Sequence, residues 1–333
     1  MEIRFHTIIL LAMIFSTCSR EEVVDTGFEM AAKTGKEVND ILVWQHLEKL
    51  ASSHTHDVKV DNSGLASDEN FPSDQLSRDS ATGIVVQVLQ DLGYNADTVV
   101  MPGEDSLLAY NIVAEYPGTT KANEVVLIGV HHDAFYTGAD DNSSAVAALL
   151  EMARVIRNHT FARTIRLVSF DLEDFGSIGS TRFVKAGYAD DVVAAIVMDM
   201  IGYASDEPES QDNLMGIKLP DKGDFLFVIG NEQSASMTQQ MVAMSNTHHL
   251  SKVLGVLAPG DGVYFLSSAF MRSDHAMLWF NGIPTVFLTD GANFRNPYYH
   301  TAEDTPDKLD PVFLSNNTKL LTAAVALFAE QIP

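Results

Sequence analysis

The sequence is poor in cysteine, in positive charge and in long apolar runs. Its 333 residues include one cysteine, Cys18, so no disulfide can form within the chain, and stability must come from an apolar core or bound metal. Lysine and arginine number 21 against 45 aspartates and glutamates, a formal net charge of −24. Such a chain cannot neutralise phosphates, which excludes nucleic acid as a partner. The sequence also lacks the Gly-x-Ser-x-Gly turn that carries a serine nucleophile.

The first 17 residues have the pattern of a signal peptide. Arg4 supplies a positive start, and the apolar run Ile8–Phe15 is too short to span a bilayer. Cys18 follows at once, and Phe15-Ser16-Thr17-Cys18 resembles a bacterial lipoprotein cleavage box, although Thr17 is larger than the usual residue there. We therefore expect a lipid on Cys18 and a protein anchored in the bacterial cell envelope, outside the cytoplasm. The alternative is an ordinary secreted protein whose Cys18 is removed or unused.

The rest of the chain predicts one α/β domain. Residues 18–37 are polar and are interpreted as a lipidated tether, and the domain covers residues 38–333. Strands are expected at residues 97–101, 107–115, 125–130, 164–171, 192–199, 224–230 and 283–288. Helices are expected at residues 40–51, 73–92, 145–157, 234–245, 273–280 and 311–332. Because the segment 192–199 is almost wholly apolar, we expect a mostly parallel mixed sheet with helices on both faces.

Polar side chains follow four of these strands, at the point where each strand ends. His131, His132 and Asp133 follow the strand 125–130. The other ends carry Glu173 with Asp174, then Asp199, then the loop that holds His300. Because the carboxyl ends of parallel strands share one edge of a sheet, these side chains can converge on one crevice. Histidine and carboxylate without cysteine suit a borderline-hard divalent ion, zinc first.

Five segments make this pattern specific. In chain order they are GVHHD, GADDNSSAVAALLE, FDLEDFGSIGS, VMDMIGY and YHTAEDTPDKLD. Together they resemble the motif set of the co-catalytic di-zinc aminopeptidases, the leucyl-type bacterial enzymes among them, and the resemblance covers about residues 40–331. The family also contains glutamate carboxypeptidases and animal glutaminyl cyclases. The resemblance implies a zinc-exopeptidase fold, two zinc ions, and hydrolysis of N-terminal peptide bonds of peptide substrates by a hydroxide that the two ions share.

The resemblance also implies a set of metal ligands. His131 and Asp199 resemble the ligands of one zinc ion, and Asp174 and His300 those of the other. Asp141 resembles the carboxylate that bridges both ions. Because Asp141 lies just before a helix, its charge is favoured by the positive helix end.

Four further residues resemble parts of the family's active site. Glu173 resembles the general base, and Tyr299 a hydrogen-bond donor to the developing oxyanion. Asp133 would hold the second ring nitrogen of His131. Asp274 would support the site near the substrate pocket, with capping of a helix as the alternative. The family usually has Glu-Glu where this chain has Glu173-Asp174, so the shorter Asp174 puts the second ion's position or affinity in doubt, and we expect the site to persist.

Other polar residues have simpler interpretations. His132 cannot point to the same side as His131, because a strand alternates its faces. Asp140 is expected to be solvated or to form a turn, and His248 and His249 to lie at a helix end. Ser273-Asp274-His275 cannot be a nucleophilic triad, since the three residues are consecutive.

Three alternatives to an aminopeptidase stay open. A glutaminyl cyclase of the same fold would use one zinc ion and move a proton within its substrate. A carboxypeptidase would need an arginine cluster in the pocket, and only Arg272 and Arg295 are placed to contribute. A lipid-anchored binding protein would keep the fold without turnover.

Overall fold

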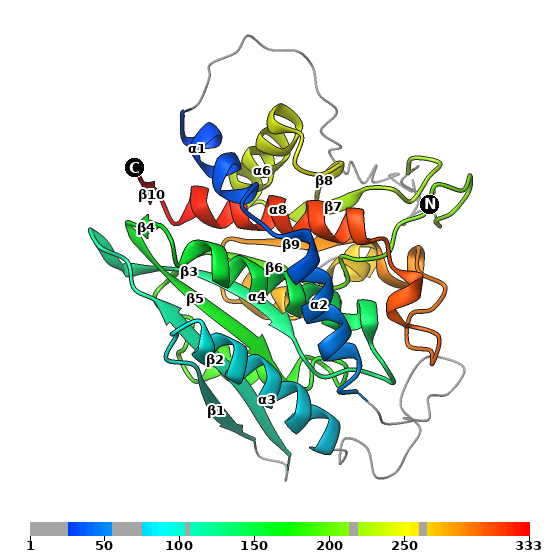
Figure 1. Ribbon diagram of the computed structural model, residues 1–333, viewed down its shortest axis with the longest axis horizontal. Coiled ribbons are helices and arrows are strands. Elements are labelled where there is room, and N and C mark those ends of the chain that lie inside the picture. Colours follow the sequence, from blue (N-terminus) through cyan, green and yellow to red (C-terminus); the bar gives the residue numbers. More distant parts are fainter. Residues whose placement is uncertain (1–25, 55–74, 104–106, 213–218, 260–264) are drawn as a thin grey trace, which may run out of the picture.

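The computed structural model describes residues 26–54, 75–103, 107–212, 219–259 and 265–333 (Figure 1). Their centre is an eight-stranded sheet in the order β1-β2-β5-β3-β6-β9-β7-β8. Its strands are β1 (Asp97–Pro102), β2 (Leu108–Tyr116), β3 (Lys121–His131), β5 (Arg163–Phe170), β6 (Val192–Met198), β7 (Leu226–Gly230), β8 (Val253–Leu257) and β9 (Thr285–Thr289). Two short strands, β4 (Thr160–Phe161) and β10 (Gln331–Ile332), pair separately.

The four central strands β5, β3, β6 and β9 run parallel to one another. The remaining pairs are antiparallel, except for β7 with β8. In β3 every residue from Val125 to His131 is buried, as a strand covered on both faces requires. The predicted mixed, mostly parallel sheet is confirmed, and the four strands followed by His, Asp or Glu are the parallel ones.

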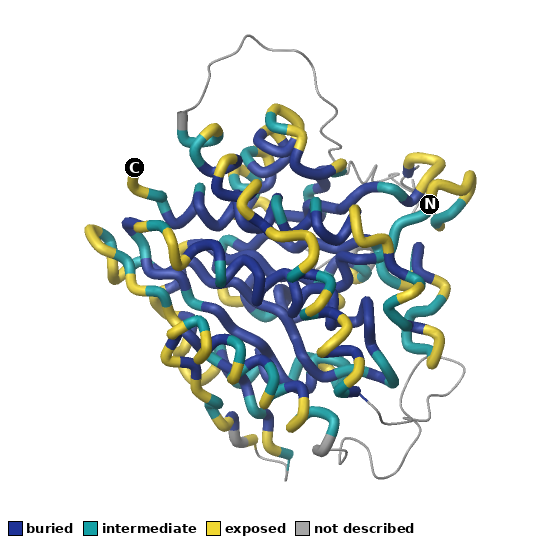
Figure 2. Tube along the Cα trace, viewed as in Figure 1, coloured by how far each residue is buried: buried dark blue, intermediate teal, exposed yellow. Residues whose placement is uncertain are grey.

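Helices cover both faces of the sheet. One face carries α1 (Thr26–Gly35), α2 (Asp40–Ala51), α3 (Gln75–Asp91), α4 (Ala145–Ile156), α6 (Ala235–His248) and α8 (Pro311–Phe328). The other face carries α5 (Ile178–Lys185) and α7 (His275–Phe280). Figure 2 shows α4, α8 and the central strands of the sheet in the colour of buried residues, with the exposed residues on the outer surface. Among the described residues no helix combines the length and the apolar character needed to cross a bilayer.

The ends of α2 and α8 follow capping chemistry. The side chain of Asn39 accepts hydrogen bonds from the backbone N–H groups of Ile41 and Leu42, so Asn39 is the cap of α2. Asp310 caps α8 in the same way, and Pro311 follows at the first helical position. Both helices therefore start where a side chain satisfies the free backbone N–H groups.

The N-terminal helix α1 corrects the prediction of a tether. The polar segment before residue 38 was expected to be a linker, yet Thr26–Gly35 is a helix that packs on α8. Ala31 and Ala32 are buried in the larger core. The short side chain of Gly35 permits the close approach, because a Cβ there would lie 2.4 Å from the Lys319 carbonyl oxygen. The domain therefore begins before residue 38. Cys18 lies outside the described residues.

Two further predictions about elements were incomplete. Strand β8 and the β4–β10 pair have no counterpart in the periodicity analysis, because β8 has only five residues and β4 and β10 only two each, too few to show a period. The last helix ends at Phe328, and the chain then turns to pair with β4.

Candidate metal centre

The carboxyl ends of the parallel strands and the loops that follow them bring the predicted ligands together. His131 is the last residue of β3, and Asp199 directly follows β6. Asp174 lies in the loop after β5, and His300 in the loop after β9. Asp141 belongs to the irregular turn η1 (Ala139–Ser144) that leads into α4.

Asp141 lies between two groups of side chains. Its Oδ1 atom is 3.3 Å from Nε2 of His131, which is itself 3.5 Å from Oδ1 of Asp199. Its Oδ2 atom is 2.9 Å from Nε2 of His300, which is 3.1 Å from Oδ1 of Asp174. Each oxygen of one carboxylate thus faces its own histidine and its own second carboxylate. This is the arrangement that a bridging ligand needs.

Asp133 connects the two groups from behind. Nδ1 of His131 is 3.1 Å from the Asp133 carbonyl oxygen and 3.6 Å from its carboxylate. The two carboxylate oxygens of Asp133 accept hydrogen bonds from the backbone N–H groups of Glu173 and Asp174, at 3.0 and 3.2 Å. Asp133 therefore orients the His131 ring and fixes the loop that carries the neighbouring acidic pair, which is how outer residues tune metal ligands.

Glu173 lies next to the group of His131 and Asp199, on that side of Asp141. Its Oε2 atom is 3.9 Å from Nε2 of His131, and its Oε1 atom accepts a hydrogen bond from the Ser177 hydroxyl at 3.2 Å. Asp174 faces His300 instead, so adjacent residues serve different parts of the centre. Although aspartate is shorter than the glutamate usual at this position, the Asp174 side chain still reaches His300. The departure from Glu-Glu therefore does not prevent Asp174 from facing the centre.

The backbone is in the left-handed region at several positions around the centre, three of them at or next to predicted site residues. Leu172, Met200 and His300 have φ of 60°, 58° and 55°. Non-glycine residues adopt this conformation only where the surroundings impose it. Around Met200 that support comes from Asn142, whose side chain donates to the Met198 carbonyl and accepts from the Met200 N–H, both at 3.0 Å.

The turn that carries Asp141 requires glycine at its start. Gly138 has φ of 51°, and a Cβ there would lie 2.4 Å from the side chain of Ala134 and 2.4 Å from the Asp141 carbonyl oxygen. Asp304 holds the same turn from the other side, because its carboxylate accepts hydrogen bonds from the backbone N–H groups of Asp140 and Asp141. Asp304 and Asn142 both lie within motif segments quoted above, but neither of them was expected to have this positioning role.

The electrostatics of the centre favour bound positive charge. Burial disfavours the charged form of His300, but the carboxylates of Asp174 and Asp141 outweigh it and raise the pKa of His300 to about 11. Burial raises the pKa of Asp174 to about 7, and it raises the pKa of Glu173 well above its ordinary value. Buried carboxylates at this density require protons or cations nearby.

The donor atoms fit a divalent metal. Three groups, each with ligand atoms within 4.8 Å of one another, occur among the described residues: His131 with Asp133 and Asp174, His131 with Glu173 and Asp199, and Asp141 with Asp174 and His300. Within the described chain, Nε2 of His131 and Oδ2 of Asp174 are buried without a hydrogen-bond partner. Imidazole nitrogen with carboxylate oxygen is a donor set that zinc accepts. The individual ligand assignments stay predictions.

Asp274 lies close to the same centre. It is 1% exposed, and both of its carboxylate oxygens are without a hydrogen-bond partner by distance and angle among the described residues. Burial raises its pKa to about 8. Its side chain makes no capping bond to α7, so the alternative interpretation as a helix cap is wrong. Its carboxylate interacts electrostatically with His131, Asp133 and Glu173, which places it near the centre.

The residues expected to be bystanders lie outside the centre, with one correction. His132 points to the opposite side and contacts the hydroxyls of Thr82 and Ser169, each at 3.0 Å. The expectation that Asp140 is solvated is wrong. It is fully buried and accepts hydrogen bonds from the Gly202 N–H and the Asn296 side chain.

Two other polar segments contribute nothing to the ligand groups. His248 and His249 end α6, and the ring of His275 stacks on Phe287 at 4.0 Å. Asp171, at the same strand end as Glu173, turns away and pairs with Arg78 of α3 at 2.6 Å. These residues serve the packing of the helices around the centre.

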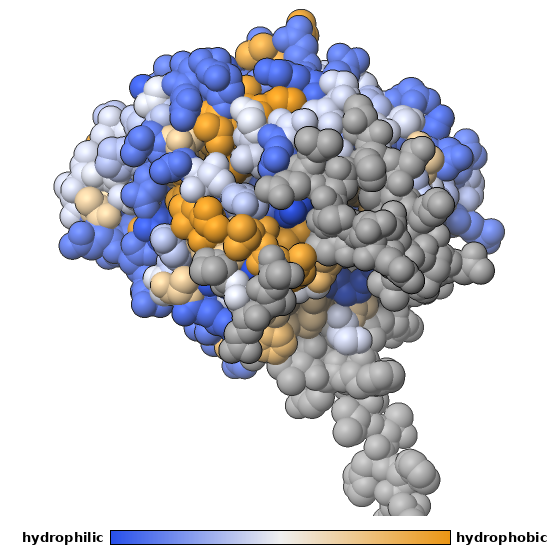
Figure 3. All heavy atoms as spheres, turned by 90° about the horizontal axis from the view of Figure 1, so that it is seen from below, coloured by the Kyte–Doolittle hydropathy of each residue, from blue (hydrophilic) through white to orange (hydrophobic). Residues whose placement is uncertain are grey.

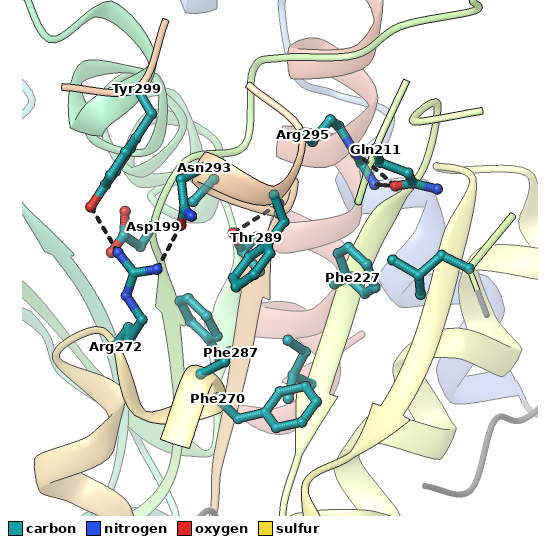
Figure 4. A pocket seen from close by; sticks show the side chains of 16 residues that line it. Asp199, Gln211, Phe227, Phe270, Arg272, Phe287, Thr289, Asn293, Arg295 and Tyr299 are labelled. Atoms are coloured by element: carbon teal, nitrogen blue, oxygen red, sulfur yellow. Dashed lines mark hydrogen bonds between the residues drawn. The ribbon is translucent and has the colours of Figure 1, made fainter. Parts of the chain in front are cut away.

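An apolar pocket opens beside Asp199 (Figure 4). Phe227, Ile229, Phe270 and Phe287 form much of its wall. Gln211 and Leu219, from the chain before β7, and residues 269, 270 and 272 line the pocket together with residues of β7 and β9. Figure 4 shows the Tyr299 and Asp199 side chains at one end of the pocket.

The two arginines weighed as carboxypeptidase determinants differ in their surroundings. Arg295 is buried and donates to the Phe225 carbonyl and the Gln211 side chain. Arg272 is exposed and lies at the other end of the pocket, beside Tyr299. The two guanidinium groups form no cluster.

A family model settles the relationship of this geometry to known proteins. The model described as peptidase family M28 matches residues 111–325, a span that contains all five predicted ligands and Glu173. The chain belongs to peptidase family M28. The predicted resemblance is thereby confirmed, and the M28 match makes the chain a member of a metallopeptidase family.

Individual M28 relatives are more distant. The uncharacterized protein YfbL of Escherichia coli is 32% identical over 219 residues, which cover 60% of this chain and 65% of YfbL. The probable glutamate carboxypeptidase AMP1 of Arabidopsis thaliana is 27% identical over 61% of this chain and 28% of its own length. The chain thus spans less than two thirds of either relative. The Legionella pneumophila LapA aminopeptidase has a similar fold, with a TM-score of 0.65 at 21% identity over 96% of this chain and 79% of LapA.

Proposed function

We propose that this protein is a zinc-dependent aminopeptidase that removes the N-terminal residue from peptides. The observation that carries the proposal is the position of Asp141, whose two oxygens face two separate pairs, His131 with Asp199 and His300 with Asp174. Two complete pairs around one shared carboxylate support two metal ions rather than one.

The protein's own residues would divide the work of hydrolysis. Two zinc ions held by the five ligands would polarise the scissile carbonyl and lower the pKa of water. Glu173, close to His131 and outside the His300 group, would accept the proton of the attacking water and return it to the leaving amine. Tyr299, beside Asp199 in the pocket, would donate a hydrogen bond to the developing oxyanion.

The pocket supports a particular kind of substrate. Its wall of phenylalanine, leucine and isoleucine side chains suits a large apolar residue at the N-terminus of the peptide. A carboxypeptidase is supported less well, because Arg295 already binds Gln211 and the Phe225 carbonyl. A glutaminyl cyclase would bind one zinc ion, so one of the two pairs around Asp141 would hold no metal.

A panel of blocked peptides on metal-analysed protein tests the proposal. We expect two zinc ions per chain and release of leucine from a leucyl peptide with an amidated C-terminus, with no cleavage of an N-acetylated peptide that has a free C-terminus. The opposite selectivity would indicate a carboxypeptidase. Conversion of N-terminal glutamine to pyroglutamate with one zinc would indicate a cyclase. Bound zinc without any turnover would leave a binding protein and contradict the proposal.

We also propose that the protein is lipid-anchored through Cys18 in the bacterial cell envelope. The proposal is supported by the short apolar run and by the Phe15-Ser16-Thr17-Cys18 segment. Mass spectrometry of the N-terminal peptide from the membrane fraction should find a diacylglyceryl group on Cys18. The Cys18→Ser variant should lack that group and leave the lipoprotein pathway. An unmodified Cys18, or its absence from the mature chain, would favour the secreted alternative.

A further inference from the structure

Arg272 forms a bridge between two residues of the pocket mouth. Its guanidinium donates one hydrogen bond to Oδ1 of Asn293 at 2.5 Å and another to the hydroxyl oxygen of Tyr299 at 3.3 Å. Figure 4 shows the Arg272 guanidinium bonded to the Tyr299 hydroxyl on one side and to Asn293 on the other, at the end of the pocket that Asp199 also lines. Nothing in the motif set assigns Arg272 a role in the reaction.

The direction of the Arg272–Tyr299 hydrogen bond has a chemical consequence. A guanidinium has only donors, whereas a phenol hydroxyl has one donor and two acceptor positions. The Tyr299 oxygen must therefore accept, and its own O–H proton is not used on Arg272. A hydrogen bond from a charged donor also polarises the hydroxyl that accepts it, which strengthens the bond that this hydroxyl donates in turn.

The Tyr299 ring is held from two further sides. It stacks on the ring of His300, with centroids 3.7 Å apart, and the guanidinium carbon of Arg272 lies 5.9 Å from its centroid. Asn293, in the short helix η4 (Ala292–Phe294), holds the guanidinium from the opposite end. The position of the hydroxyl thus depends on a chain of contacts that begins at Asn293.

We propose that Arg272 is a positioning residue that acts through Tyr299. It fixes and polarises the phenol so that the O–H group is donated to the scissile carbonyl oxygen as negative charge develops there. This inference rests on the proposed function, because Tyr299 is there the oxyanion donor. It differs from direct binding of a substrate carboxylate by Arg272, and the two ideas predict different results.

A double-mutant cycle separates them. With an amidated leucyl peptide, Tyr299→Phe should lower kcat by about 100-fold, since that is the scale for losing one oxyanion donor. Arg272→Ala should lower kcat by about tenfold with little change in KM, because the donor is kept but loosened. Arg272→Ala in the Tyr299→Phe background should have no further effect. Two effects that multiply would show that Arg272 acts independently and would overturn the inference.

Conservative and matched variants complete the comparison. Arg272→Lys should recover part of kcat, because lysine keeps a charged donor but loses the planar geometry that reaches two partners. Arg157→Ala is the control, since Arg157 also lies over a tyrosine ring, 5.4 Å from that of Tyr94, and does not line the pocket. Unchanged kcat in Arg272→Ala, with folding confirmed by its melting temperature, would count against the proposal.

Calorimetry gives a readout that needs no turnover. The phosphonate analogue of leucine has a tetrahedral oxyanion, whereas leucine has a planar carboxylate. If Arg272 acts through Tyr299, Arg272→Ala should weaken phosphonate binding about tenfold and leave leucine binding unchanged. Equal weakening of both ligands would indicate direct contact with the anion and would contradict the proposal. If the wild type cleaves no peptide, the proposed function fails, and this comparison still decides the role of Arg272.

Discussion

At the scale of single residues, the centre depends on carboxylates that have different tasks although they are chemically alike. Asp141 shares its oxygens between two histidines, Asp133 holds backbone N–H groups, and Glu173 keeps one oxygen on Ser177. Burial raises the pKa of Glu173 and Asp274, which makes both groups better proton acceptors than exposed carboxylates. The loops and strand ends, rather than the residue type, assign each role.

Replacement of Glu173 by glutamine should separate metal binding from catalysis. The amide keeps the shape and size of the side chain but cannot accept a proton, so kcat should fall by about 10² to 10⁴. Zinc content should stay at the wild-type value, because the five ligands are untouched. Peptide hydrolysis and metal analysis measure the two quantities on the same sample. The exposed Glu207 offers the control Glu207→Gln, and wild-type turnover in Glu173→Gln would remove Glu173 from the mechanism.

Asp133→Asn should weaken zinc binding rather than turnover at saturating zinc. The variant loses the charge next to His131 and one acceptor for the Glu173–Asp174 loop, and losses of this kind cost about 10- to 100-fold in metal affinity. Titration against a chelator of known zinc affinity gives the number. Asp79→Asn, on the exposed side of α3, is the matched control. An unchanged zinc affinity would mean that the backbone carbonyl of Asp133 alone orients His131.

At the scale of elements, four parallel strands end at the same edge, and the predicted ligands lie at these strand ends or in the segments that follow them. The remaining elements keep that edge in shape. Helix α8 packs on α4, and α1 packs on α8, so the N-terminal helix is part of the same layer as the helix that follows Asp141. The sequence did not reveal that α1 belongs to the domain, because the residues that it buries are mainly alanines within an otherwise polar segment.

A larger residue at Gly35 should destabilise the domain. The Cβ of Gly35→Val would lie against the Lys319 carbonyl and 3.0 Å from the Ala323 side chain, where α8 cannot yield without moving. Overpacking of this kind costs about 1 to 3 kcal/mol, and glycine-to-valine exchange near a helix end offsets little of it. Thermal unfolding by circular dichroism should show the lower stability. Lys36→Val, at an exposed neighbour, serves as control, and equal melting temperatures of wild type and Gly35→Val would restore the tether interpretation.

At the scale of the whole molecule, some of the many acidic side chains are buried, and these carboxyl groups determine how the free energy of unfolding depends on pH. Burial raises the pKa of Asp174 from 3.8 to about 7 and that of Asp274 from 3.8 to about 8. The folded protein therefore holds protons that the unfolded chain has already released. The neighbouring carboxylates raise the pKa of His300 from 6.5 to about 11 against the effect of burial. His300 therefore also holds its proton more strongly in the folded protein than in the unfolded chain. The free energy of unfolding of metal-stripped protein consequently falls as pH rises.

Metal-stripped protein should lose stability between pH 4 and pH 8, and zinc should prevent most of that loss. The stabilisation by Asp174 and Asp274 is complete below their unfolded pKa of 3.8 and disappears as pH passes about 7 and about 8. A bound cation replaces the protons, so the difference in melting temperature between zinc-loaded and EDTA-treated protein should grow by about 5 °C or more over this range. Scanning calorimetry at several pH values measures it. A difference that shrinks with pH would contradict the pKa directions.

The sequence by itself determined the strand ends and the residues placed on them. Apolar β-branched runs, each followed by His, Asp or Glu, predicted a parallel sheet with one polar edge, because strand geometry fixes which end of each strand faces that edge. His131, Asp141, Asp174, Asp199 and His300 were named on this basis and on the motif resemblance, and the structure brings them within one centre.

Only the tertiary structure decided which polar residues turn toward that edge. Asp140 and Asp171 carry the same side chain as their ligand neighbours, yet they bind Asn296 and Arg78, which are 156 and 93 residues away in the chain. The packing of α1 on α8 and the contact of Arg272 with Tyr299 are of the same kind. Periodicity and spacing describe a residue's place within its own element, and contacts between distant elements arise only when the apolar layers have packed.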